Sequence, residues 1–135
     1  VDLFFEEVAM QVIKGRIRHQ DDLEKYVPPG HHGTVNVRLI EKEFCGAFEM
    51  AHGTLDPGGV AHAHDHEIEH QVVYVLDGLC DVALGDDPVV ECRAGSIIEI
   101  PPKVMHEVTA KSETPLKVLV IYSPPLPPRD DVPVD

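Results

Sequence analysis

The stretch GGVAHAHDHEIEHQVVYVLDG, residues 58–78, and the stretch GSIIEIPPKVMH, residues 95–106, carry the most distinctive pattern of the chain. Five of the nine histidines lie within residues 52–70, and a sixth, His106, ends the second stretch. Neutral imidazole is the commonest metal ligand in proteins. Alternate residues of a strand point to the same side, and three histidines have this spacing: His62, His64 and His66. The first stretch therefore indicates a strand that binds a metal.

The polar residues and glycines of the two stretches are separated by fixed intervals. In the first, gaps of five, one, four and six residues separate Gly58, His64, His66, Gln71 and Gly78. In the second, a glycine, a proline, a lysine and a histidine take the key positions: Gly95, Pro101, Lys103 and His106. This pair of patterns resembles the two motifs of the cupin superfamily. With the strands around the motifs, the resemblance covers most of residues 34–123.

The resemblance implies a divalent transition metal and its ligands. The positions that match the ligands of the family are His64, His66, Gln71 and His106, and Gln71 stands where a carboxylate is common. Two positions depart from the second motif, because Lys103 replaces its last glycine and Ala110 replaces its asparagine. Neither position is a ligand in the family, so the departures concern the loop conformation and not metal binding.

Other ligand sets fit the sequence less well. His62, His64 and Glu69 give a second register of the first motif, but it requires glycines at two positions that hold Asp56 and Leu76. A closed zinc site is another interpretation, built from His62, His64, His66 and His70. It leaves the second stretch unexplained, and structural zinc normally prefers some cysteine. A third interpretation makes the histidines surface residues of a polar loop, and then the two spacings would agree by accident.

Length, charge and cysteine content narrow the class of protein. A chain of 135 residues forms one domain that can bury about two-thirds of its unfolded surface. The net charge of −13 argues against nucleic-acid binding, because a phosphate backbone would be repelled. No apolar run is long enough to span a bilayer, so we expect no membrane partner. Three cysteines without a ligand-like spacing are typical of reduced thiols in a cytoplasmic protein.

The pattern of hydrophobic residues predicts an all-β fold. From Thr34 onward the chain reads as short strands with period two, divided by turn signals such as residues 56–59, which we expect to separate two strands. Such a pattern is typical of a sandwich or barrel, and the resemblance narrows it to a single-domain cupin jelly-roll β-barrel, a double-stranded β-helix. We assign an N-terminal arm or edge segment to residues 1–33, the barrel to 34–123, and a Pro/Asp-rich surface arm or disordered tail to 124–135. Loop histidines at His31 and His32 are interpreted as surface residues. By resemblance we also expect a homodimer.

The expected ligand set is electrically neutral, so a bound divalent ion keeps its full charge. Such an ion should attract an anionic substrate, and manganese, iron, nickel and zinc all remain open. Glu99 is a candidate general base or an outward carboxylate, and Arg38 could bind a substrate carboxylate or be exposed. His62 could line the mouth of the site. We expect a metal-dependent enzyme for a small anionic organic molecule, with an oxygenase favoured over an isomerase, lyase or decarboxylase. A non-catalytic cupin that binds a metal or small ligand is the alternative.

Overall fold

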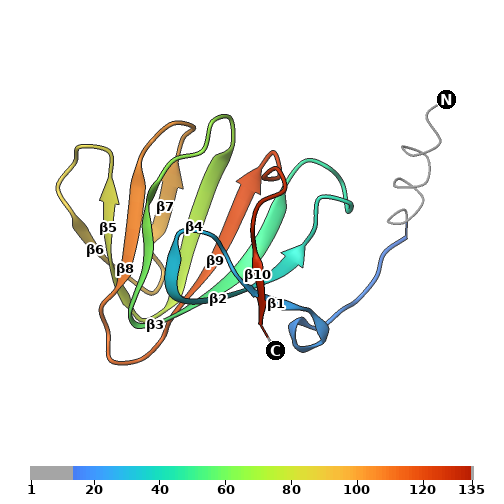
Figure 1. Cartoon of the computed structure of the whole chain (residues 1–135), viewed down its shortest axis with the longest axis horizontal. Coiled ribbons are helices and arrows are strands. Elements are labelled where there is room, and N and C mark those ends of the chain that lie inside the picture. The colour runs from blue at the N-terminus through green and yellow to red at the C-terminus, as the bar shows by residue number, and fades with distance from the viewer. Residues whose placement is uncertain (1–13, 135) are drawn as a thin grey trace.

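The computed structural model describes residues 14–134 and is nearly all-β (Figure 1). The ten strands are β1 Lys25–Val27, β2 His31–Ile40, β3 Glu49–His64, β4 His70–Asp77, β5 Leu79–Leu84, β6 Val90–Arg93, β7 Ile97–Ile100, β8 His106–Ala110, β9 Leu116–Ser123 and β10 Val132–Val134. One short 3-10 helix, Gln20–Asp22, precedes them. Every strand pairing is antiparallel, and the sheet curls around a core, as expected for the jelly-roll. No helix within residues 14–134 is long and apolar enough to cross a membrane.

The long strand β3 holds the two halves of the barrel together. Its first half pairs with β2 and β9, and its second half pairs with β8, which continues to β5 and β6. The predicted turn at residues 56–59 is wrong, because these residues form a bulge inside β3 opposite Gly33. A Cβ on Gly59 would lie 2.8 Å from the carbonyl oxygen of Gly33, so only glycine fits this close approach.

Alternate residues of each strand point into the barrel, and most of them are apolar. The inner faces of β4 and β9 carry Val73, Val75, Val118 and Val120, while β7 contributes Ile98 and Ile100. Toward one end of the barrel the inward positions become polar: Gln71 at the start of β4 and His106 at the start of β8 are buried among them. The curled sheet thus encloses an apolar core whose one end carries groups that can bind a ligand.

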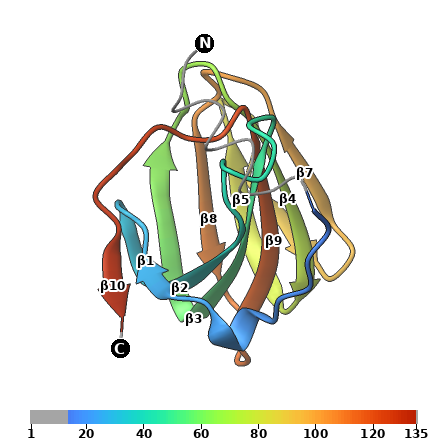
Figure 2. The same cartoon turned by 90° about the vertical axis from the view of Figure 1, so that its right-hand side faces the viewer.

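The segment after β9 is ordered, and we call residues 124–134 the C-terminal strap. Its last residues form β10, which pairs with β1 at the edge of the fold (Figure 2). The backbone N–H of Leu126 donates a 2.6 Å hydrogen bond to Glu49 Oε1, and Asp131 Oδ2 lies 2.9 Å from Arg38 Nη2. The strap is therefore fixed at both ends. The expected N-terminal arm lies partly outside the described residues, and β2 already begins at His31.

Candidate metal centre

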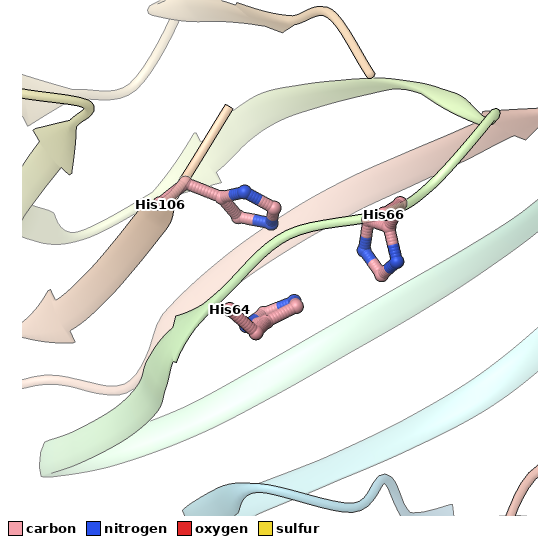
Figure 3. A group of neighbouring side chains, drawn as sticks. All are labelled: His64, His66 and His106. Atoms are coloured by element: carbon pink, nitrogen blue, oxygen red, sulfur yellow. The ribbon is translucent and has the colours of Figure 1, made fainter. Parts of the chain in front are cut away.

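Three imidazoles converge at the polar end of the barrel (Figure 3). They belong to His64 at the end of β3, His66 in the following loop and His106 at the start of β8. One ring nitrogen from each lies within 4.8 Å of the others. The ring centroids are 4.2 Å apart for His64 and His106, and 4.9 Å apart for His64 and His66. The structure therefore brings together the three predicted histidine ligands, whereas His62 of the competing register is not a member of this group.

Strand register explains why residues so distant in sequence meet here. His64 and His106 are direct partners in the ladder between β3 and β8. Gln71 is the direct partner of Tyr122 in the ladder between β4 and β9. The side chains of these residues occupy inward-facing positions of their strands, so the strand pairing brings them to the same cavity. They are His64, Gln71, His106 and Tyr122. The Gln71 side chain, the fourth predicted ligand, thus lies in the same cavity as His64 and His106.

Backbone carbonyls set the tautomers of two of the imidazoles. Nδ1 of His64 lies 2.7 Å from the carbonyl oxygen of His62, and Nδ1 of His106 lies 2.9 Å from that of Val104. A carbonyl oxygen only accepts, so each Nδ1 carries the proton and each Nε2 keeps a free lone pair. This is the arrangement in which a metal-binding histidine is held by a partner on its other nitrogen.

The donor atoms lack other partners, as a metal site requires. Nε2 of His66, Nε2 of His106 and Oε1 of Gln71 are buried without a hydrogen-bond partner among residues 14–134. A buried polar atom without a partner costs free energy. A divalent transition metal would satisfy all three atoms together with Nε2 of His64, so the residues present fit the group that the sequence implies.

Burial keeps the ligands in the state that metal binding needs. Burial, with the nearby charges of His64 and His106, lowers the pKa of His66 to about 4. Burial also lowers the pKa of His106 below its ordinary value. Because a histidine ligand must be neutral to donate its lone pair, these two imidazoles are ready to bind a metal at neutral pH without releasing protons.

The loop that carries His66 is held by the residue that departs from the second motif. Lys103 has a positive φ of 67°, the left-handed conformation that glycine adopts most easily. Its backbone N–H donates a 2.7 Å hydrogen bond to the carbonyl oxygen of His66. The loop thus keeps the backbone shape expected of a glycine there, and Lys103 bears the strain of that shape.

Two cavities adjoin the histidines. The inner one has a volume of about 50 Å³ and is lined mainly by the apolar core and by Thr34, Asn36 and Gln71. The outer one, which we call the mouth pocket, has a volume of about 780 Å³ and opens to solvent. The inner cavity can hold little more than one small molecule such as water, whereas the mouth pocket is large enough for a small organic ligand.

Four residues at the centre were not expected there from the sequence: His31, Glu69, Tyr122 and Arg129. His31 faces His64 with ring centroids 6.4 Å apart, and burial lowers its pKa to about 4. The Tyr122 ring packs edge-on against His66 at 5.3 Å, and burial raises its pKa to about 12. Glu69, which was considered only for the competing register, is buried and lines the mouth pocket, as Arg129 does.

Only Tyr122 had a usable signal in the sequence. It continues the inward alternation of Leu116, Val118 and Val120 in β9. His31 and Arg129 reach the site through the pairing of β2 with β3 and of β10 with β1, which no local pattern predicts.

Two of the predicted site residues are not brought to the histidines. Glu99 is exposed on the outer face of β7, because the neighbouring Ile98 and Ile100 take the inward positions. It has no access to the cavity, so the outward alternative holds. Arg38 lines neither cavity and binds the chain's own carboxylates, Glu49 and Asp131. His62 is exposed and lines the mouth pocket.

An all-β jelly-roll with three histidines converging at one end defines the class of small barrel proteins that can hold a metal ion there. The sequence model of the family described as Cupin domain matches residues 51–122, which is more than half of the chain. The chain therefore belongs to the cupin family. None of the curated proteins matches its sequence.

Several solved structures are similar in fold. The polyketide cyclase RemF from Streptomyces resistomycificus is 25% identical with a TM-score of 0.73, over 90% of this chain and 87% of that one. A predicted oxalate decarboxylase from Thermotoga maritima is 21% identical with a TM-score of 0.72, over 80% of this chain and 98% of that one. KdgF from Halomonas sp. is 22% identical with a TM-score of 0.69, over 82% and 94%. The structural similarity extends along most of this chain in all three comparisons, although the sequence identities are low.

Proposed function

We propose that the protein is a metal-dependent enzyme that moves a proton on a small anionic organic molecule, as an isomerase, lyase or cyclase does. One observation carries the proposal: the neutral ligand set adjoins two cavities that carry a guanidinium, a carboxylate, an imidazole and a phenol. Arg129, Glu69 and His31 line the mouth pocket, and Tyr122 lines the inner cavity, which His31 also reaches. A divalent metal bound by the histidines and Gln71 would act as a Lewis acid on a carbonyl or carboxylate oxygen of the substrate.

The residues around the ligands divide the remaining work. Arg129 attracts the anionic oxygen of the substrate. Glu69, buried at the mouth pocket, is the carboxylate that can accept a proton from a carbon beside a carbonyl. Tyr122 keeps its proton at neutral pH, because its pKa is raised to about 12, and can therefore donate a hydrogen bond to an oxygen that gains charge. Nδ1 of His31 is buried without a partner and provides a further polar contact.

The solved structures support this reaction class over the one favoured by the sequence. Two of the similar structures are named as a polyketide cyclase and as a predicted oxalate decarboxylase, and neither name describes an oxygenase. An oxygenase is the second candidate, because the inner cavity of about 50 Å³ is mainly apolar and of a size that suits a diatomic gas. A cupin that only binds its metal and ligand is the outcome expected if neither reaction is found.

The experiment combines metal analysis with two activity assays. Metal content is measured for the wild type and for His64→Ala/His106→Ala, purified without added metal. Both proteins are then incubated in D₂O with a panel of enolisable acids (pyruvate, acetoacetate, oxaloacetate and phenylpyruvate) and followed by proton NMR, with an oxygen electrode in parallel. We expect metal in the wild type alone, and metal-dependent loss of C–H signals or decarboxylation without oxygen uptake.

Each other result has a defined meaning. Oxygen uptake that depends on the metal replaces the proposal with the oxygenase. Bound metal without turnover of any of these acids favours the binding protein. A folded wild type that takes up no metal refutes the ligand assignment itself.

A further inference from the structure

The C-terminal strap contributes the cation of the mouth pocket. Arg129 lines this pocket together with the histidines, and no other lysine or arginine among the described residues does so. Its side chain is 21% exposed, which leaves it accessible from the pocket. Arg129 also acts on the centre electrostatically, since its charge contributes to the lowered pKa of both His31 and His66. The strap is thus a wall of the site and not only a closing element of the sheet.

The guanidinium of Arg129 is held in a defined orientation. Its Nε forms an ion pair with Asp131 Oδ1 at 3.1 Å. Asp131 is itself fixed by Arg38 Nη2 at 2.9 Å, and Arg38 by Glu49 Oε2 at 3.1 Å. A guanidinium has five N–H donors, so donors remain for a ligand after the contact with Asp131 is made. A preorganised arginine loses less freedom when it binds a carboxylate bidentately.

Charges of the opposite sign line the mouth pocket where the β3–β4 loop forms its wall. The loop between β3 and β4 contributes three carboxylates to the mouth pocket: Asp65, Glu67 and Glu69. Glu67 is paired with Lys103, whose Nζ lies 3.6 Å from its Oε1. The other two, Asp65 and Glu69, line the same pocket as His64 and His66 and supply negative charge near the neutral ligand set. A substrate anion is therefore repelled from the loop wall and attracted to the strap wall.

The remaining lining of the mouth pocket is apolar. Its larger side chains are Pro29, Ile68, Pro125, Leu126 and Pro127, from the β1–β2 connection, the β3–β4 loop and the strap. Ile68 is 62% exposed, although such a side chain would gain by burial against an apolar partner. With a volume of about 780 Å³, the pocket exceeds the needs of a two- or three-carbon acid. These walls fit a substrate that has an apolar body of ring size.

We propose that the substrate is a carboxylate with an attached aromatic or similarly bulky apolar body, and that Arg129 is the residue that selects it. The carboxylate binds the guanidinium of Arg129, Asp131 positions that guanidinium, and the body packs against the prolines of the strap and against Ile68. This inference deepens the proposed function and rests on it, because it assigns the substrate class of the same site.

The experiment measures binding by isothermal titration calorimetry with three probes. Benzoylformate has both a ring and a carboxylate, 1-phenyl-1,2-propanedione replaces the carboxylate by a methyl ketone, and pyruvate lacks the ring. The proteins are the wild type, Arg129→Met, Asp131→Asn and the control Arg93→Met. Arg93 is exposed on β6, at the opposite end of the strand order from β10, and its replacement changes the net charge equally. Metal content and circular dichroism are recorded for every variant, and titrations are run with and without metal.

We expect benzoylformate to bind the wild type at least about tenfold more tightly than either other probe, because each lacks one of the two recognised groups. Arg129→Met should weaken the binding of benzoylformate at least about tenfold and leave the binding of the dione unchanged, with unaltered metal content. Asp131→Asn should weaken the binding of benzoylformate by a smaller factor, and Arg93→Met should have no effect on binding.

Two results would overturn the inference while leaving the metal enzyme intact. The first is a metal-loaded Arg129→Met that binds benzoylformate as the wild type does. The second is binding of pyruvate as tight as that of benzoylformate, which would show that the pocket does not recognise an apolar body. Failure of the proposed function has a different signature, namely a folded wild type without metal, and the titrations without metal then test Arg129 alone. If the wild type shows no detectable binding of any of the three probes, either with or without metal, the assigned substrate class is also refuted.

Discussion

Replacing Glu49 by alanine should loosen the C-terminal strap and destabilise the protein. Glu49 begins β3, and its side chain is only 8% exposed. Its Oε1 accepts the backbone N–H of Leu126 at 2.6 Å, and its Oε2 accepts Arg38 Nε at 3.1 Å. One buried carboxylate thus connects β3 with the start of the strap and, through Arg38 and Asp131, with its end.

The expected cost follows from these two contacts. A hydrogen bond between a backbone N–H and a charged acceptor contributes about 1.5–3 kcal/mol when buried. The ion pair adds about 1 kcal/mol at most, because 29% of the Arg38 side chain remains exposed. Glu49→Ala should therefore lower the free energy of unfolding by about 3 kcal/mol. Glu49→Gln keeps an oxygen acceptor for Leu126 and should cost less.

The assay is urea unfolding at pH 7 followed by circular dichroism, with amide hydrogen exchange to locate the change. Protection of the Leu126 amide should fall most in Glu49→Ala. The matched control is Asp81→Ala, which removes a carboxylate paired with Lys111 at 3.2 Å where both side chains are 39% exposed, and it should change stability far less. A Glu49→Ala variant no less stable than this control, or one with an unchanged Leu126 amide, would refute the role given to this carboxylate.

Three further perturbations test the centre. Gln71→Glu should weaken benzoylformate binding at least about tenfold, because the ligand set gains a negative charge; calorimetry on the metal-loaded variant that shows equal or tighter binding contradicts the argument. With a chelator present to keep the site free of metal, lowering the pH should destabilise the protein, because burial lowers the pKa of His31 and of His66 to about 4. The unfolded chain therefore binds more protons below about pH 6.5, and stability is lost as the pH falls from there to about 4. Urea midpoints at pH 7, 5.5 and 4.5 measure this loss, which His31→Gln should reduce, and a flat profile contradicts it. Lys103→Gly should raise the unfolding free energy by up to about 1 kcal/mol by relieving the positive φ; a thermal melt that shows lower stability, or loss of metal, would show that the side chain matters instead.

Much of the fold could be predicted from local spacing, and the metal ligands could be predicted from the resemblance of two such spacings to the cupin motifs. Gln71, Val73 and Val75 share the inner face of β4, as period-two alternation requires. Two separate spacings indicated His64, His66 and His106, and the structure brings these three together. The predicted break at residues 56–59 failed because a bulge and a turn have the same glycine signal, and only pairing with β2 distinguishes them.

The roles of isolated charged residues were harder to predict. Arg38 was considered as a ligand of a substrate carboxylate or as an exposed residue, and the structure pairs it with Glu49 and Asp131 of its own chain. Glu99 was assigned to the pocket or to the outer face, and the inward positions of its neighbours in β7 place it outside. A single polar residue has no periodicity of its own, so its partner is known only after the strands are paired.

The sequence by itself determined the all-β class, the inward face of the main strands and the residues that can hold a metal. The first two follow from the alternation of a strand, which is a property of neighbouring residues, and the ligands follow from the resemblance of two short motifs to those of the cupins. Only the tertiary structure decided what surrounds the metal ligands. The antiparallel pairing of β10 with β1 brings Arg129 of a proline-rich tail to the mouth pocket beside His66. Such pairing depends on backbone hydrogen bonds and burial between segments from opposite ends of the chain, and no local pattern of residues records it.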